Sequence, residues 1–412
     1  MHAATLAHVS EFKPNHDEAA VPAYELPPII DIGGVAAWPA RRAELLELFK
    51  REIYGQAPGW RPNLSVTVAE REPDACGGIA TRWQLQVSID GAPGFDLLAF
   101  VPNHRDGPVA GFCGLNFRGN HACHPDPAIA LARGWVPDDG IVGASGHEAS
   151  SALRGSGALR WPIELICSRG YAVATVYCGD FDPDFHDEFV NGVHGLAAAA
   201  GYGHDPVAGW GAIGAWAWGL SRALDALDAV DGFDTTRVAA IGHSRLGKTA
   251  LWAGAQDERF AAVISNNSGC LGAALSRRCF GETVGKITTT FPHWFCGNCA
   301  GYAKREDELP VDQHQLLALI APRPLYVASA TGDAWADPRG EWLSTLAADE
   351  VYQELDTIGL GGVTQQPEAG EPAGELVRYH LRPGPHGITA WDWWHYCDFA
   401  DAHLGGDGPT AW

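Results

Sequence analysis

Long apolar runs are missing from this sequence of 412 residues. No stretch approaches the roughly 20 consecutive apolar residues that a transmembrane helix requires, so we expect no membrane partner. Residues 1–20 lack the basic and apolar regions of a secretory signal peptide. We therefore expect a chain that is either cytoplasmic or written in its mature form.

Basic residues are also few. The 28 Lys and Arg residues stand against 50 Asp and Glu residues, which gives a formal net charge of -22. Because like charges repel, this balance argues against nucleic acid and against an anionic membrane as partners. An anionic substrate would need cations placed locally at its binding site.

The ten cysteines form no dense framework of the kind that stabilises small secreted domains. Cys296 and Cys299 form a CxxC pair, but no second CxxC or HxxxH lies nearby to complete a tetrahedral zinc site. We expect buried thiols or a disulfide at this pair, and no metal.

The apolar segments predict an α/β fold. Segments that alternate or run apolar between Gly and Pro residues predict a β-meander at 64–70, 80–89 and 96–101. Short continuous apolar runs predict strands buried on both faces at 109–116, 171–177, 238–242, 261–265 and 324–330. Helices are expected at 40–54, 161–168, 211–230 and 249–256. Strands that alternate with helices indicate a mostly parallel sheet covered on both faces.

The composition allows one large core, with 46% hydrophobic and 19% charged residues. No internal repeat is evident. We expect an extended lead-in over residues 1–35 and a single domain over residues 36–412, in which the Gly- and Pro-rich segment 357–375 is a surface loop. The 16 tryptophans are many; such residues often line sugar or aryl sites, although most are simply core residues.

Residues 238–248 (VAAIGHSRLGK) place Ser244 at the bend of a strand-turn-helix unit. Gly242 and Gly247 flank a tight turn in which a side chain would clash with neighbouring backbone. The spacing GHSRLG is one residue longer than the usual GxSxG on its far side. This geometry predicts a nucleophilic serine, and the alternative is an ordinary turn that Ser244 caps.

A serine hydroxyl needs a base, and the base needs an acid that orients it. His386 lies in a Pro/Gly loop after an expected strand at 376–381, the position of the base in α/β hydrolases. The alternative is a loop histidine that caps a nearby helix.

Two aspartates follow the strand expected at 324–330. Asp333 lies three residues past the end of that strand, within reach of an imidazole, and is preferred as the acid. Asp337 precedes Pro338 and is more typical of a turn or helix cap.

Together these residues resemble the bacterial branch of the glucuronoyl esterases of carbohydrate esterase family 15. The motifs that carry the likeness are GHSRLGK at 242–248, SNNSGCLGAALSRR at 265–278, GLNFRGNH at 114–121, RGSGALRWP at 154–162 and HGIT at 386–389. The likeness covers residues 40–403, and it implies an α/β-hydrolase fold with a mostly parallel central sheet in a three-layer sandwich.

The resemblance also implies an activity: hydrolysis of the ester between 4-O-methyl-glucuronic acid of glucuronoxylan and lignin alcohols, with no metal and no organic cofactor. The expected partners are glucuronoxylan and lignin-carbohydrate esters. A monomer and a periplasmic or extracellular location are expected from the likeness alone.

The likeness assigns roles residue by residue: nucleophile Ser244, base His386, oxyanion stabiliser Arg245, sugar-binding Lys248 and Glu282, and pocket-lining Trp335. Each of the last four has a plainer alternative. Arg245 and Lys248 could form an exposed helix face, Glu282 could cap a helix, and Trp335 could belong to the core.

One position departs from the family pattern. Many members carry the acid as a glutamate in a motif like NESG, whereas this chain has Asn267 in SNNSG. An amide cannot compensate the charge of an imidazolium. The departure therefore favours Asp333 as the acid.

Two other functions stay open. An acetyl xylan esterase or other carbohydrate esterase could use the same scaffold, since fold does not determine substrate. A catalytically silent carbohydrate-binding relative is the other alternative, because the family glutamate is missing.

Overall fold

A mixed β-sheet runs through the protein, whose structure is a computed structural model that describes residues 12–30, 34–142 and 144–405. Within these ranges the strand order is β1-β2-β3-β5-β4-β6-β7-β8-β10-β9. The strands are β1 Leu64–Ala75, β2 Ala80–Ile89, β3 Ala92–Pro102, β4 Val109–Asn116, β5 Ala172–Tyr177, β6 Phe233–His243, β7 Ala262–Asn266, β8 Leu325–Ala330, β9 Ala373–Gly374 and β10 Val377–Arg382.

The sheet has an antiparallel part and a parallel part. Strands β1, β2 and β3 form the expected meander, and β3 pairs antiparallel with β5. From β5 through β4, β6, β7 and β8 to β10 every pairing is parallel. The carboxyl ends of these parallel strands therefore meet at one edge, where α/β folds place their ligands.

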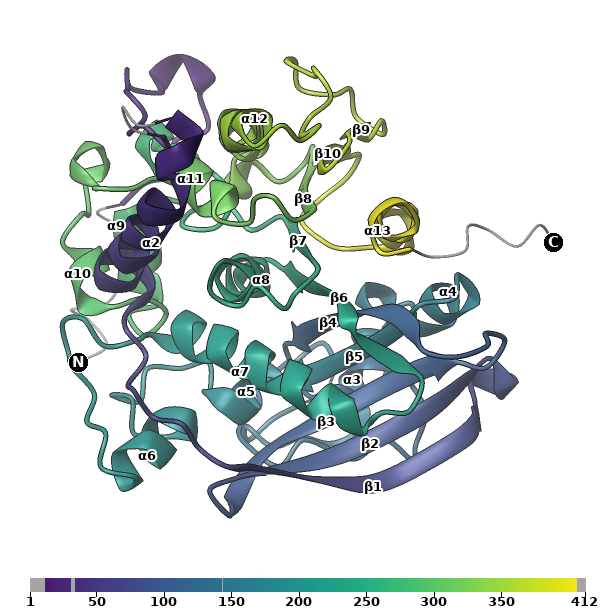
Figure 1. The fold of residues 1–412 in the computed structure, drawn as a ribbon. Coiled ribbons are helices and arrows are strands. Elements are labelled where there is room, and N and C mark those ends of the chain that lie inside the picture. The colour runs from purple at the N-terminus through teal and green to yellow at the C-terminus, as the bar shows by residue number, and fades with distance from the viewer. Residues whose placement is uncertain (1–11, 31–33, 143, 406–412) are drawn as a thin grey trace.

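Helices cover both faces of the sheet. They are α2 Trp38–Phe49, α3 Asn120–Cys123, α4 Ile163–Ser168, α5 Cys178–Phe181, α6 Gly192–Ala199, α7 Ala212–Ala226, α8 Arg245–Gln256, α9 Val284–Thr290, α10 Gly297–Ala300, α11 Gln313–Ala318, α12 Pro338–Glu354 and α13 Ala390–His403. Figure 1 shows α2, α7 and α8 on one side of the sheet, and α4 and α13 on the other. This arrangement confirms the predicted three-layer α/β sandwich.

Two hydrophobic cores result from this layering. Strand β4 is buried along its whole length, and its side chains alternate between the cores: Cys113 and Leu115 join one, whereas Ala110 and Phe112 join the other. Trp252 of α8 packs in the first core. Alternation over a continuously apolar strand is what a sheet covered on both faces requires.

The bounds of two predicted helices need correction, and two long helices were not predicted. The helix expected at 40–54 begins at Trp38 and continues beyond Phe49 as a π-helical turn, Lys50–Tyr54. The helix expected from residue 249 begins at Arg245, directly after the serine. The long helices α12 and α13 were not predicted, since apolar and polar residues mix on them without a clear stripe.

Residues 12–30, the described part of the segment expected to be an N-terminal lead-in, contact residues far along the chain. The Glu18 carboxylate pairs with the Arg278 guanidinium at 2.8 Å, and the Gly281 N–H donates to the Asn15 carbonyl at 2.7 Å. Residues 1–11 of the lead-in lie outside the described residues. No helix within the described ranges is long and apolar enough to cross a membrane.

Candidate active site

Ser244 occupies a strained turn between β6 and α8. Its backbone has φ 58° and ψ −131°, a conformation that residues with a side chain rarely adopt. A Cβ at Gly242 would lie 1.9 Å from the Leu246 carbonyl oxygen, so only glycine fits there. At Gly247 the nearest contact of a Cβ would be 3.0 Å, to Ser268, a milder constraint. The turn thus holds the serine at the carboxyl edge of the sheet.

The structure brings an imidazole and a carboxylate together from two loops. His386 follows β10 and Asp333 follows β8, and His386 Nδ1 lies 2.6 Å from Asp333 Oδ2. The Asp333 side chain is 3% exposed and that of His386 is 42% exposed. Because Nδ1 is engaged by the carboxylate, Nε2 is left to exchange a proton.

Asn267 supports the same carboxylate. Its Nδ2 donates to Asp333 Oδ2 at 2.8 Å. Burial acts to raise the pKa of Asp333, but the hydrogen bond and charge of His386, together with the Asn267 hydrogen bond, outweigh it and hold that pKa below its ordinary value. The amide of Asn267, the position where this chain differs from the family pattern, therefore helps to orient an anionic Asp333.

Asp337 belongs to another cluster and does not line the active-site cavity. It caps α12 by accepting a hydrogen bond from the Gly340 N–H at 2.9 Å, as its place before Pro338 predicts. It also pairs with Arg278 Nε at 2.8 Å.

Arg245 forms an ion pair with Asp184, which lies in the loop after α5. Its Nε lies 2.7 Å from Asp184 Oδ2, and its guanidinium lies 4.5 Å from the centre of the Phe117 ring. Asp184 Oδ1 accepts hydrogen bonds from Trp294 Nε1 at 2.7 Å and from His293 Nε2 at 3.0 Å. Burial acts to raise the pKa of Asp184, but Arg245, His293 and Trp294 lower it below its ordinary value. Asp184 is therefore an anion that fixes the guanidinium.

Lys248 and Glu282 place two ionisable side chains in the lining of the cavity. Lys248 is 3% exposed, so it is not part of an exposed helix face, and its Nζ donates to the carbonyls of Ser268 and Cys270. Burial lowers the pKa of Lys248 and raises that of Glu282, and the attraction between the two opposes both shifts. Glu282 does not cap α9, because Thr283 does.

All seven candidate site residues that were predicted from the sequence line one cavity of about 330 Å³. They are Ser244, Arg245, Lys248, Glu282, Asp333, Trp335 and His386. Trp335 is 39% exposed, so it is a wall residue and not core. A cavity of this size, with aromatic side chains and several convergent polar groups in its lining, suits a single sugar ring with a substituent.

Asp184, Phe291 and Trp294 belong to the site but were not predicted. Phe291 and Trp294 line the cavity, and Asp184 contacts Arg245 and Trp294. A signal for Asp184 did exist, since it follows β5 at the carboxyl edge of the parallel strands. The aromatic pair follows no strand and belongs to no motif, so nothing in the sequence marked it.

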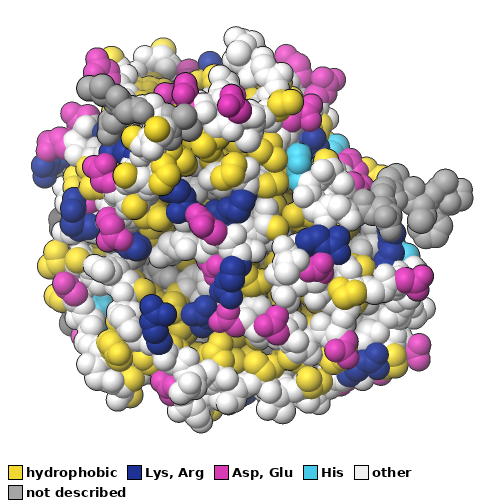
Figure 2. Space-filling model, in the orientation of Figure 1, with side chains coloured by type: hydrophobic (Ala, Val, Ile, Leu, Met, Phe, Trp, Pro, Cys, Tyr) yellow, Lys and Arg dark blue, Asp and Glu magenta, His cyan; other side chains and the backbone are white. Residues whose placement is uncertain are grey.

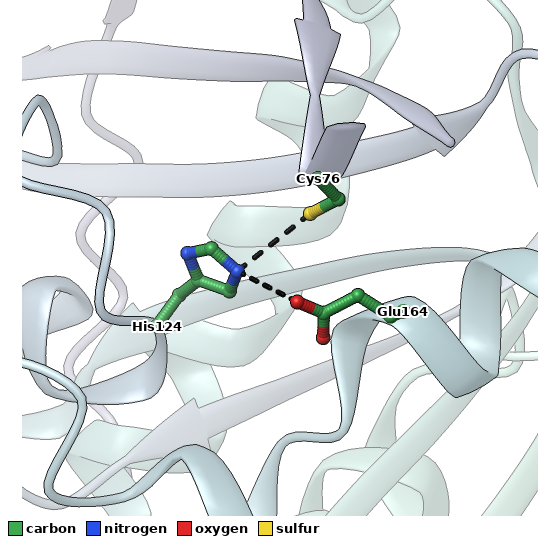
Figure 3. A group of neighbouring side chains, drawn as sticks. All are labelled: Cys76, His124 and Glu164. Atoms are coloured by element: carbon green, nitrogen blue, oxygen red, sulfur yellow. Dashed lines mark hydrogen bonds and ion pairs between the residues drawn. The ribbon is translucent and has the colours of Figure 1, made fainter. Parts of the chain in front are cut away.

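One group of side chains outside the cavity has the composition of a metal site (Figure 3). Cys76 Sγ lies 3.6 Å and Glu164 Oε1 lies 3.2 Å from His124 Nε2. However, the Asp126 N–H donates to His124 Nδ1 at 3.2 Å, which leaves the ring proton on Nε2. A metal on Nε2 would move that proton to face an N–H donor, so the group fits a hydrogen-bonded cluster better than a ligand set.

All ten cysteines are free thiols, and Cys296 and Cys299 are both buried. Of the two readings of the CxxC pair, the structure therefore shows buried thiols. Burial raises the pKa of Cys296 to about 11, so this thiol stays protonated at neutral pH.

Comparison with known proteins identifies similar chains. A family model described as glucuronyl esterase, fungi, matches residues 202–356. The chain is 46% identical to the carbohydrate esterase MZ0003 of an unknown prokaryotic organism, over 95% of this chain and 92% of that protein. It is 36% identical to a 4-O-methyl-glucuronoyl methylesterase of Hypocrea jecorina, over 38% of this chain and 35% of that protein.

Solved structures agree with the sequence matches. A glucuronoyl esterase from Solibacter usitatus superposes with a TM-score of 0.86 at 42% identity, over 93% of this chain and 99% of that chain. A promiscuous CE15 esterase from a marine bacterial metagenome superposes with a TM-score of 0.87 at 45% identity, over 95% of this chain and 100% of that chain.

Proposed function

We propose, since this chain belongs to carbohydrate esterase family 15, that it hydrolyses the ester between 4-O-methyl-glucuronic acid of glucuronoxylan and lignin alcohols. One observation carries the proposal: the His386 and Asp333 pair lies in the same cavity as Ser244, Lys248 and Glu282. Ser244, His386 and Asp333 supply the parts of an acyl-transfer site. Lys248 and Glu282 supply polar groups for sugar hydroxyls.

Acylation begins with Ser244. His386 Nε2 accepts the hydroxyl proton while the oxygen attacks the carbonyl carbon of the uronate. Asp333 stabilises the imidazolium that forms, because it is anionic and bonded to Nδ1. When the tetrahedral intermediate collapses, His386 returns the proton to the departing alcohol.

Two donors stabilise the oxyanion. The backbone N–H of Arg245 is the first of α8, and such donors have no partner within their own helix. The Arg245 guanidinium, fixed by Asp184, adds a positive charge where negative charge develops. Water activated by His386 then attacks the acyl-enzyme, and Ser244 recovers its proton as the glucuronic acid leaves.

The first test compares two substrates. We expect the enzyme to release alcohol from a benzyl ester of glucuronic acid much faster than acetate from acetylated xylan, with activity lost in Ser244→Ala. Faster acetyl release would assign an acetyl xylan esterase instead. A protein that binds glucuronoxylan but turns over neither substrate would be a silent carbohydrate-binding relative.

We further propose a monomer in the periplasm or outside the cell, because a polymeric wall substrate is met there. The net charge of -22 supports repulsion from nucleic acid and anionic membranes. Figure 2 shows acidic and basic side chains interspersed over the visible face. Cell fractionation and light scattering test these two points.

A further inference from the structure

A second cavity lies on the side of the loop after α5 that faces away from Arg245. It has a volume of about 590 Å³, and Trp135, Phe185, Asp180 and Asn191 are among its lining residues. Nothing in the proposed acyl transfer uses these residues. A space of this size is larger than the catalytic cavity of about 330 Å³, so it can take more than one sugar ring.

The loop after α5 separates the two cavities. Pro183 and Phe185 line the second cavity, whereas Asp184 between them contacts Arg245 and Trp294 of the first. Consecutive residues of this loop thus point alternately toward the second cavity and toward the catalytic cavity. A ligand in the second cavity would contact the neighbours of the residue that fixes Arg245.

The aromatic side chains of the second cavity are held in place. The Trp135 ring stacks on His147 with centroids 5.1 Å apart, and it lies 4.9 Å from the Phe185 ring. The Trp135 carbonyl accepts a hydrogen bond from the Tyr177 hydroxyl at 2.7 Å. A half-buried tryptophan fixed in this way loses little side-chain entropy when a flat ligand packs on it.

Polar groups surround this aromatic platform. Asp180 Oδ2 accepts the Asp96 N–H at 3.1 Å, and Arg133 Nη2 lies 2.7 Å from Asp96 Oδ1. Asn191 adds an exposed amide, and four of the lining residues are glycines, which expose backbone donors and acceptors. A carboxylate, an amide and a guanidinium beside a tryptophan match the hydroxyl groups and apolar ring faces of a neutral sugar.

From this arrangement we infer that the second cavity is a subsite for a neutral xylose chain, with Trp135 as the stacking platform and Asp180 and Asn191 as hydroxyl partners. The choice of xylose rests on the proposed function, since glucuronic acid is attached to a xylan backbone in that substrate. An aromatic alcohol would offer few hydrogen bonds to the Asn191 amide and to the second oxygen of the Asp180 carboxylate.

Binding of unsubstituted xylohexaose, measured by calorimetry, tests the subsite without any ester. We expect the parent to bind it, Trp135→Ala and Asn191→Ala each to weaken binding by about tenfold, and Trp394→Ala to leave it unchanged. Trp394 is a matched control because it is 49% exposed on α13 and packs on Arg169, outside this cavity. Thermal unfolding checks that each variant is folded, and Asn191→Ala decides the matter if Trp135→Ala does not fold.

Absence of xylohexaose binding by the parent, or binding that ignores both cavity substitutions, would overturn the subsite. So would binding of a monomeric aromatic alcohol through Trp135 in place of the sugar. Kinetics separate this inference from the proposed function: Trp135→Ala should lower kcat/KM for a glucuronoxylo-oligosaccharide ester about tenfold and leave a simple benzyl glucuronate unchanged. If the parent binds xylohexaose but has no esterase activity, the proposed esterase function is wrong and the subsite is supported.

Discussion

Two aspartates in the loop after β8 are buried to the same degree, at 3% and 2% exposure, but their surroundings differ. Asp333 faces His386, and its pKa lies below the ordinary value. Asp337 faces Arg278 and caps α12, and burial raises its pKa more than Arg278 lowers it. Burial alone therefore does not identify an acid for acyl transfer. We propose Asp333 as that acid because of its distance from the strand end and its partner, His386.

Replacement of Asp333 should have the largest effect. In Asp333→Asn the amide cannot compensate the imidazolium and favours the wrong tautomer, so kcat should fall by roughly 10³- to 10⁴-fold. Steady-state hydrolysis of a benzyl glucuronate measures this. A loss of less than about tenfold would mean that the two aspartates do not differ in the way proposed.

Asp337→Asn should affect stability and not turnover. The substitution removes one of the two carboxylates that pair with the Arg278 guanidinium and leaves Glu18 as the other, which costs about 2 kcal/mol of unfolding free energy. Denaturant unfolding measures the cost, and kcat at a temperature where the variant is folded should stay within about twofold of the parent. A large loss of kcat with unchanged stability would reverse the assignment of the two residues.

A third, partly buried carboxylate, Asp184, extends the comparison to the other side of the serine. Asp184→Asn should lower kcat by about 10- to 100-fold, because Arg245 loses the anion that fixes it. In an Arg245→Gln background the same substitution should have little further effect. Effects that simply multiply in the double variant would show that Asp184 does not act through Arg245.

Glu341 gives the most pH-dependent effect, and this effect is on stability alone. It is fully buried, accepts the Gly269 N–H at 2.9 Å, and burial raises its pKa to about 8. Between the unfolded pKa near 4.3 and this value, the unfolded chain loses a proton that the folded chain keeps, so folding stability falls as pH rises.

Glu341→Gln removes this titration. The stability of the variant relative to the parent should therefore increase from pH 5 to pH 8 by up to about 1.4 kcal/mol per pH unit and then level off. Thermal unfolding across this range measures the difference. A difference that stays constant with pH would contradict the raised pKa.

The parallel strands and most of the candidate site residues could be predicted from the sequence. The apolar runs identified the parallel strands because strands buried on both faces must be continuously apolar. Ser244 and Asp333 could be selected because each follows such a strand, and His386 because it lies in a Pro/Gly loop after the strand expected at 376–381. Asp337 could be set apart because Pro338 follows it.

Other features depend on contacts between distant segments. Nothing in the local pattern shows that Asn267 would donate to Asp333, or that Asp184 would hold Arg245. Helices α12 and α13 were missed because tertiary packing, and not an apolar stripe, stabilises them. The second cavity is likewise formed by residues of β3, α5 and α6 and of the loops around Trp135 and Phe185, segments whose approach the sequence does not encode locally.

The most direct measurement of the central claim is the rate at which a fluorophosphonate modifies Ser244, since that rate reports activation of the hydroxyl without any choice of substrate. Mass spectrometry of the labelled peptide would follow the parent, Asp333→Asn and Asp337→Asn under the same conditions. We predict rapid labelling of Ser244 in the parent and in Asp337→Asn, and labelling at least a hundredfold slower in Asp333→Asn. Equal rates in all three proteins, or modification of a different residue, would contradict the account.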